Sequence, residues 1–139
     1  MNLRKWIATD NAATTLLIRM VVGVVFLSEG IQKFLFAKAQ GAGRFEKMGL
    51  PYADFLGPFV GLTEMLCGLL IALGLLTRFA AIPLIIIMQV AIYTTKLPML
   101  YDGGIWKMLH ESRTDWAMLL CSIFLLIRGG GAFSVDREL

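Results

Sequence analysis

The sequence predicts an all-α protein, a transmembrane four-helix bundle with a polar lid between its third and fourth helices. Its 139 residues are 58% hydrophobic and 17% charged, whereas a soluble globular domain is about 45–50% apolar and about 25% charged. The mean hydropathy is accordingly high, at +0.73. Because a membrane helix needs about 20 residues, four such helices take up most of the chain. We therefore expect one domain over residues 1–139, without a separate soluble catalytic domain.

The first two spans are predicted from long apolar segments. Residues 13–36 are too many for the apolar region of a signal peptide, which has about 7–15 residues, and they include Arg19 and Glu29. We therefore expect a membrane helix there. A polar connection with several glycines follows, and the second span is predicted over residues 58–76, starting at Pro58.

The third span is predicted over residues 79–95. Thr77 and Arg78 leave room only for a tight hairpin between the second and third helices. Lys96 and Pro98 are expected to end the third helix, because proline lacks the N–H that a helix interior needs.

The segment 99–113 is too polar to span a membrane and contains Tyr101 and Trp106, which are typical of the membrane interface. We expect it to form a re-entrant or surface lid. Thr114 is the expected N-cap of a fourth span over residues 115–128, and three consecutive glycines at 129–131 are expected to end that helix.

The charge pattern points to a lipid bilayer rather than to nucleic acid as a partner. The net charge is +3 and the sequence pI about 9.1, without a dense run of Lys and Arg. Cys67 and Cys121 lie far apart in apolar segments and are expected to pack as small apolar residues. One histidine and scattered carboxylates show no metal-ligand spacing, so no metal site is predicted.

Polar residues of three predicted helices fall in one layer of the membrane. At 1.5 Å per residue, Glu29, Glu64 and Gln89 each lie about 9–10 Å below the same face. The connection between the third and fourth helices brings His110 and Arg113 to that face, together with Lys96 and Asp115 at its two ends. This layer is the predicted functional site.

Carboxylates inside a membrane must be paired, protonated or hydrated. Lys33 lies four residues after Glu29, at the spacing that favours an ion pair, whereas Glu64 has no local partner. Two carboxyl groups in one dry layer favour a shared proton. Gly57 and Gly61 share a helix face with Glu64, which predicts a close helix contact at that carboxylate.

These positions lead to a set of candidate roles. Glu29, Glu64 and His110 are candidates for proton transfer. The candidates for ligand binding are Lys33, Gln89, Lys96, Arg113 and Asp115. Arg19 and Arg78, near the opposite face, are expected to be structural and to reach headgroups or cap helices. The alternative for the intramembrane charges is that they simply lock the bundle.

The order and spacing of several segments resemble the DoxX family of small bacterial membrane proteins. The segments are residues 19–34 (RMVVGVVFLSEGIQKF), 58–64 (PFVGLTE), 74–78 (GLLTR), Asp115 and 129–136 (GGGAFSVD). The resemblance implies a four-helix, multi-pass protein of the bacterial cytoplasmic membrane. It also implies a distant kinship with membrane subunits of thiosulfate:quinone oxidoreductases. The family's recurring polar positions correspond to Arg19, Glu29, Lys33, Glu64, Arg78 and Asp115.

The leading functional hypothesis is an accessory subunit of a thiol-, sulfur- or quinone-linked redox system that is not catalytic on its own. Quinone is the candidate cofactor, and the candidate partners are redox enzymes and further copies of the chain. One alternative is a proton-coupled small-molecule carrier or binder. Another is a structural or assembly protein without catalysis. The sequence leaves the membrane orientation open.

Overall fold

The computed structural model describes residues 13–38, 41–47, 49, 51–132 and 134–135. Every regular element in this part of the chain is helical. The elements are α2 (Thr15–Leu35), α3 (Ala42–Lys47), α4 (Ala53–Leu73), α5 (Thr77–Ala91), the π-helix η1 (Ile92–Lys96), α6 (Leu97–Glu111) and α7 (Arg113–Arg128).

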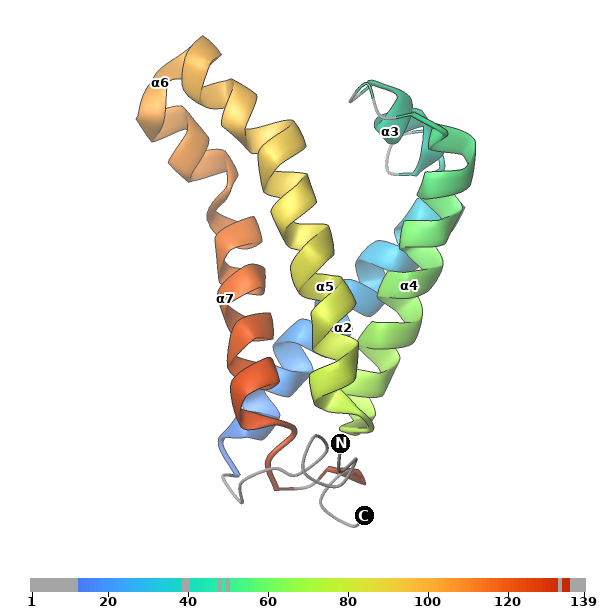
Figure 1. Cartoon of the computed structure of the whole chain (residues 1–139), viewed down its shortest axis with the longest axis vertical. Helices are drawn as coiled ribbons and strands as arrows, with labels where there is room; N and C mark the ends of the chain where they lie inside the picture. Colours follow the sequence, from blue (N-terminus) through green and yellow to red (C-terminus); the bar gives the residue numbers. More distant parts are fainter. Residues whose placement is uncertain (1–12, 39–40, 48, 50, 133, 136–139) are drawn as a thin grey trace, which may run out of the picture.

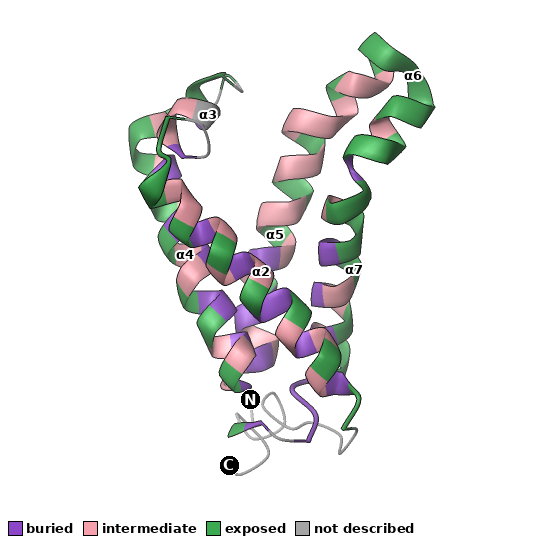
Figure 2. Cartoon of the chain, turned by 180° about the vertical axis from the view of Figure 1, so that it is seen from behind, coloured by how far each residue is buried: buried purple, intermediate pink, exposed green. Residues whose placement is uncertain are grey.

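The helices form two arms that meet at one end and diverge at the other (Figure 1). The first arm consists of α2, α3 and α4, and the second of α5, η1, α6 and α7. We call the end with the α4–α5 turn and residues 129–132 the closed end, and the end with α3 and α6 the open end. Buried residues gather towards the closed end and along the facing sides of α2 and α4, whereas α6 is largely exposed (Figure 2).

The hairpin between the second and third long helices is present as predicted. Gly74 ends α4 with a φ of 75°, and its N–H and that of Leu75 donate to the carbonyls of Ile71 and Leu70. Such a left-handed glycine is a common way to end a helix. The preceding helix starts at Ala53 rather than at Pro58, because a proline in the second turn removes one ladder hydrogen bond without stopping the helix.

The third helix continues past its predicted end. At η1 the chain makes a π-helical turn, in which the hydroxyl of Thr94 donates to the carbonyl of Val90 at 2.8 Å. Pro98 then lies in the first turn of α6, where its missing N–H is tolerated. The expectation that Lys96 and Pro98 end the helix was therefore wrong.

The segment predicted as a lid is also helical. The chain turns back at Gly104, whose φ of 82° and ψ of 175° break α6 into two parts (Figure 1), and such a φ favours glycine. Ser112, not Thr114, precedes α7, which ends at Gly129 as predicted. The structure confirms the all-α class and does not confirm the predicted four-helix bundle with a polar lid.

Three helical segments are long and apolar enough to cross a membrane: Thr15–Leu35, Ala53–Leu73 and Thr77–Glu111. The remaining long helix, α7, has 16 residues and measures about 24 Å, which is less than the roughly 30 Å of a bilayer core. The second half of α6 precedes it on the same descending side of the second arm (Figure 1).

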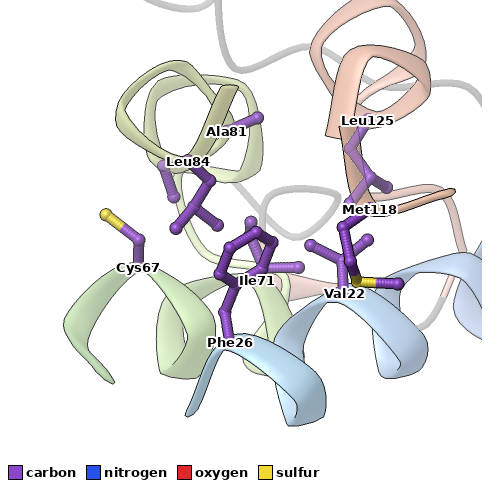
Figure 3. Close-up of a cluster of buried hydrophobic side chains, with 9 residues drawn as sticks. Val22, Phe26, Cys67, Ile71, Ala81, Leu84, Met118 and Leu125 are labelled. Carbon is purple, nitrogen blue, oxygen red and sulfur yellow. The ribbon is translucent and has the colours of Figure 1, made fainter. Parts of the chain in front are cut away.

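The hydrophobic core lies where the two arms meet (Figure 3). Side chains from all four long helices contribute to it: Val22, Phe26, Cys67, Ile71, Ala80, Ala81, Leu84, Met118 and Leu125. Phe26, Ile71, Leu84 and Leu125 are almost completely buried. Beyond Leu84, no described residue of α5, η1 or α6 is buried, so the second arm leaves the first one there.

Candidate functional site

Two ion pairs lie on the open-end side of the hydrophobic core. Each of their four residues, Lys33, Glu64, Lys96 and Asp115, comes beyond the last core residue of its helix in that direction. One pair belongs to each arm. Four residues of the predicted polar layer therefore form two separate charge pairs rather than one cluster.

The ion pair of the first arm joins Lys33 of α2 to Glu64 of α4. The distance from Nζ to Oε1 is 2.9 Å, and the side chains are 11% and 3% exposed. The expected pairing of Lys33 with Glu29 was wrong. Glu29 lies one turn from Lys33 on the surface of the same helix. Glu64 instead reaches Lys33 from α4, across the contact between the two helices.

Glycines bring α2 and α4 close enough for this pair to form. A Cβ on Gly30 would lie 2.6 Å from the carbonyl oxygen of Gly61, and one on Gly23 would lie 2.8 Å from the backbone nitrogen of Ala72. A side chain at either position would therefore push the two backbones apart. The predicted close contact beside Glu64 is present, and a Cβ on Gly61 would lie 3.1 Å from the Cβ of Lys33.

Glu29 lies one turn before Lys33 on α2 and is half-buried. Among the described residues it makes no ion pair. It lies on the side of α2 next to Val22 and Lys33, because steps of 100° place these three residues within about 40° of one another. Since Val22 belongs to the core between the arms, Glu29 lies on the side of α2 that faces the core.

The ion pair of the second arm joins Lys96 of η1 to Asp115 of α7, at 3.5 Å between Nζ and Oδ2. The two side chains are 14% and 20% exposed, so this pair is less buried than the first. It connects the ascending and descending helices of the second arm. Its lysine lies at the end of the π-helical turn, an irregularity often found at functional sites.

The structure does not bring the other predicted site residues to these ion pairs. Gln89, His110 and Arg113 are exposed, and Arg113 donates through Nη1 to the carbonyl of His110 at 2.6 Å. His110 and Arg113 belong to the α6–α7 junction of the second arm. Gln89 is turned away from the core face of α5, because it lies five residues, or roughly 140° of rotation, beyond Leu84.

Arg19 lies at the closed end, where it makes a hydrogen bond just beyond the end of α7. It is 3% exposed and donates through Nη1 to the carbonyl of Gly130, just after α7, at 3.0 Å. Arg78 follows the first residue of α5 and is half-buried. Both arginines are therefore at the opposite end from the two ion pairs.

Ser122 is a buried polar residue that was not among the candidates predicted from the sequence. Ser122 of α7 is completely buried, and its hydroxyl has no hydrogen-bond partner among the described residues. It lies seven residues after Asp115 and so on the same helix face, a spacing that would have revealed it. In the part of the chain that the structure describes, no three His, Cys, Asp or Glu side chains could together hold a metal ion.

The family of this chain follows from its match to known protein families. The sequence profile of the DoxX family matches residues 14–97, which include both members of the first ion pair and Lys96 of the second. The chain belongs to the DoxX family. The resemblance noted in the sequence is thus confirmed.

Two relatives of this DoxX protein carry names. It is 51% identical over 136 residues to the "Uncharacterized membrane protein Rv3486" of Mycobacterium tuberculosis, covering 94% of this chain and 83% of that protein. It is 29% identical over 123 residues to the "Putative oxidoreductase CatD" of Bacillus subtilis, covering 88% and 84%. No solved structure matches the chain. The family, the first relative and the three apolar helices establish a membrane protein.

Proposed function

We propose that this DoxX protein is a multi-pass protein of the bacterial cytoplasmic membrane and the membrane subunit of a redox system. In this proposal it binds a small polar headgroup between its arms, beside Glu29 and the Lys33–Glu64 ion pair. A quinone is the candidate ligand, and a redox enzyme is the candidate partner. The chain is not expected to be catalytic on its own.

This proposal rests on a buried ion pair that lies one helical turn from a second carboxyl group. That carboxyl group makes no ion pair among the described residues, and both features lie within apolar helices long enough to cross a membrane. Glu64 is 2% exposed and is paired with Lys33, while Glu29 one turn away makes no ion pair among the described residues. Polar groups of this kind are rare in membrane helices because they are costly there, and they often mark ligand or proton sites. The name of the Bacillus subtilis relative is consistent with redox chemistry.

The residues at this position suit a quinone headgroup. Its carbonyl oxygens accept hydrogen bonds and take up protons on reduction, which is the chemistry the group supplies when bound. Lys33 is a hydrogen-bond donor, and Glu29 and Glu64 are candidates to hold or release a proton. His110, exposed on the second arm, would reach the same ligand after the arms closed. Lys96 and Asp115 would line the facing side.

A test compares what co-purifies with three forms of the protein. Wild type, Glu29→Gln and the control Glu46→Gln are purified in mild detergent, and organic extracts are analysed by mass spectrometry. Glu46 is exposed at α3, outside the proposed site. We expect quinone with the wild type and the control, and little with Glu29→Gln, which leaves the Lys33–Glu64 pair and the melting temperature intact. Phospholipid alone in every extract would contradict the proposal.

A second candidate is a proton-coupled carrier. It is favoured by the placement of each ion pair within one arm, which leaves the arms separable at the open end while they are joined at the closed end. In proteoliposomes this candidate predicts substrate flux that follows a pH gradient and falls in Glu29→Gln. Sealed liposomes without flux, together with quinone in the extract, would favour the redox subunit instead.

A further inference from the structure

Gln89 is a polar side chain on the outer surface of a membrane helix. It is exposed on α5 and makes no hydrogen bond to a described residue. Thr77, the first residue of α5, is at the closed end, so Gln89 lies about 18 Å along the helix from that end. This depth is close to the middle of a bilayer core of about 30 Å.

Apart from the hydroxyl of Tyr93, the rest of the same helix face is apolar. Gln89 is flanked by exposed side chains of one outer stripe of α5 and η1: Ile82, Ile86, Val90 and Tyr93. This stripe lies opposite the face that the core buries, which consists of Thr77, Ala80, Ala81 and Leu84. The segment Thr77–Glu111 is also less buried than the other two spans, at 17% against 33% for each.

Two other polar side chains on α2 and α4 donate hydrogen bonds within their own helix, as Gln89 does not. The hydroxyl of Thr63 donates to the carbonyl of Phe59 at 2.8 Å. Gln32 donates to the hydroxyl of Ser28 at 3.0 Å. An amide that faces lipid leaves both its donor and its acceptor without a partner, which is unfavourable in an apolar medium.

We infer that a second copy of this chain covers the outer face of α5, and that the two Gln89 amides hydrogen-bond to each other. An amide carries both a donor and an acceptor, so it is complementary to its own copy. In a two-fold symmetric interface the same patch lies on both subunits, and a residue near the axis meets itself. The flanking apolar side chains supply the packing, and interhelical amide hydrogen bonds are a recognised feature of membrane helix association.

This inference goes beyond the proposed redox function and does not depend on it. It uses the face of α5 turned away from the first arm, whereas the proposed ligand site uses Glu29, Lys33 and Glu64 between the arms. Loss of quinone binding would leave the inference standing, and loss of the dimer would leave the ligand site intact.

Cysteine cross-linking of the full chain in native membranes tests the interface. In a Cys67→Ala/Cys121→Ala background, Ile86→Cys places a thiol on the proposed face. Leu69→Cys on α4 and Leu120→Cys on α7, both also exposed, are the matched controls. We expect mild oxidation to give a covalent homodimer with Ile86→Cys and little or none with the controls. Equal yields in all three, or a cross-link to a different protein, would overturn the inference.

The contribution of the amide is tested in the same background. Adding Gln89→Leu should lower the association constant of the dimer about threefold to twentyfold, whereas Gln89→Asn, which keeps an amide, should retain most of it. Because Gln89 is exposed, both variants should keep the melting temperature of the monomer. An unchanged association constant in Gln89→Leu would show that Gln89 faces lipid and would refute the hydrogen-bonded pair.

Discussion

The closed end and the open end of the molecule are held by different kinds of polar contact. At the closed end, Arg19 of the first arm donates to the carbonyl of Gly130 of the second arm, 111 residues away. At the open end, each ion pair joins two helices of the same arm: Lys33 with Glu64, and Lys96 with Asp115. The closed end therefore connects the arms, while the open end keeps each arm intact.

We expect the closed end to contribute most of the stability and the open end to be the more adaptable part of the molecule. The core and the buried polar residues Thr15, Arg19, Thr77 and Ser134 lie at or near the closed end, where several elements pack against one another. The open end has few buried residues, and regions of low packing are those that proteins use for motion and ligand binding. We expect changes at the closed end to affect the whole fold and changes at the open end to affect one arm.

The largest effect is expected from breaking the ion pair of the first arm. Glu64→Leu leaves Lys33 without its partner and should lower the free energy of unfolding by about 3 kcal/mol, as for other broken buried pairs. We expect a loss at the low end of the range of about 3–5 kcal/mol for such pairs, because Lys33 lies near the end of α2 and can reach lipid headgroups. Unfolding by SDS titration in mild detergent measures it. The double variant Lys33→Met/Glu64→Leu should recover most of the loss; no recovery would argue against the charge-pair explanation.

The next largest effect is expected at the closed end. Arg19→Leu removes a buried, charged hydrogen bond and should lower the free energy of unfolding by about 2 kcal/mol. Arg113→Leu is the matched control, because Arg113 is exposed and donates within its own turn; it should change the value by less than about 0.5 kcal/mol. An equal loss of unfolding free energy in the two variants would contradict the view that polar contacts at the closed end matter more for stability than those at the open end.

A smaller and local effect is expected from the ion pair of the second arm. Asp115→Asn weakens a pair that is 3.5 Å long and partly exposed, so the loss should be about 1 kcal/mol or less. Hydrogen exchange should become faster at the amides of η1 and the first turns of α7, and stay unchanged in α4. Faster exchange throughout α4 as well would mean that the arms are coupled at the open end.

The smallest effect is expected between the two ends, at Ser122. Its hydroxyl is buried without a hydrogen-bond partner among the described residues, so Ser122→Ala should change the free energy of unfolding by no more than about 0.5 kcal/mol, in the stabilising direction. Ser112→Ala provides the contrast, because the Ser112 hydroxyl donates to the carbonyl of Met108 at 2.6 Å. That variant should lose about 1 kcal/mol. A large loss in Ser122→Ala would reveal a partner for its hydroxyl.

Much of the fold could be predicted from local patterns. The apolar segments, the Thr77–Arg78 hairpin and the glycines after residue 128 gave helices and ends close to the observed ones, because length, hydropathy and glycine act within a few residues. Pro58 and Pro98 misled the prediction of helix ends. A proline near a helix start removes one hydrogen bond, and whether the chain stays helical depends on the packing and on irregular turns such as η1.

The sequence by itself determined that this protein belongs in a membrane, that its helices carry charged residues at similar depth, and that glycines allow α2 and α4 to approach. Only the tertiary structure decided which of those residues meet. Lys33 pairs with Glu64 rather than Glu29, and Gln89 points outward instead of joining them. The physical reason is rotation: a helix can turn about its axis without changing the depth of its residues, and its contacts with the other helices decide which side faces inward.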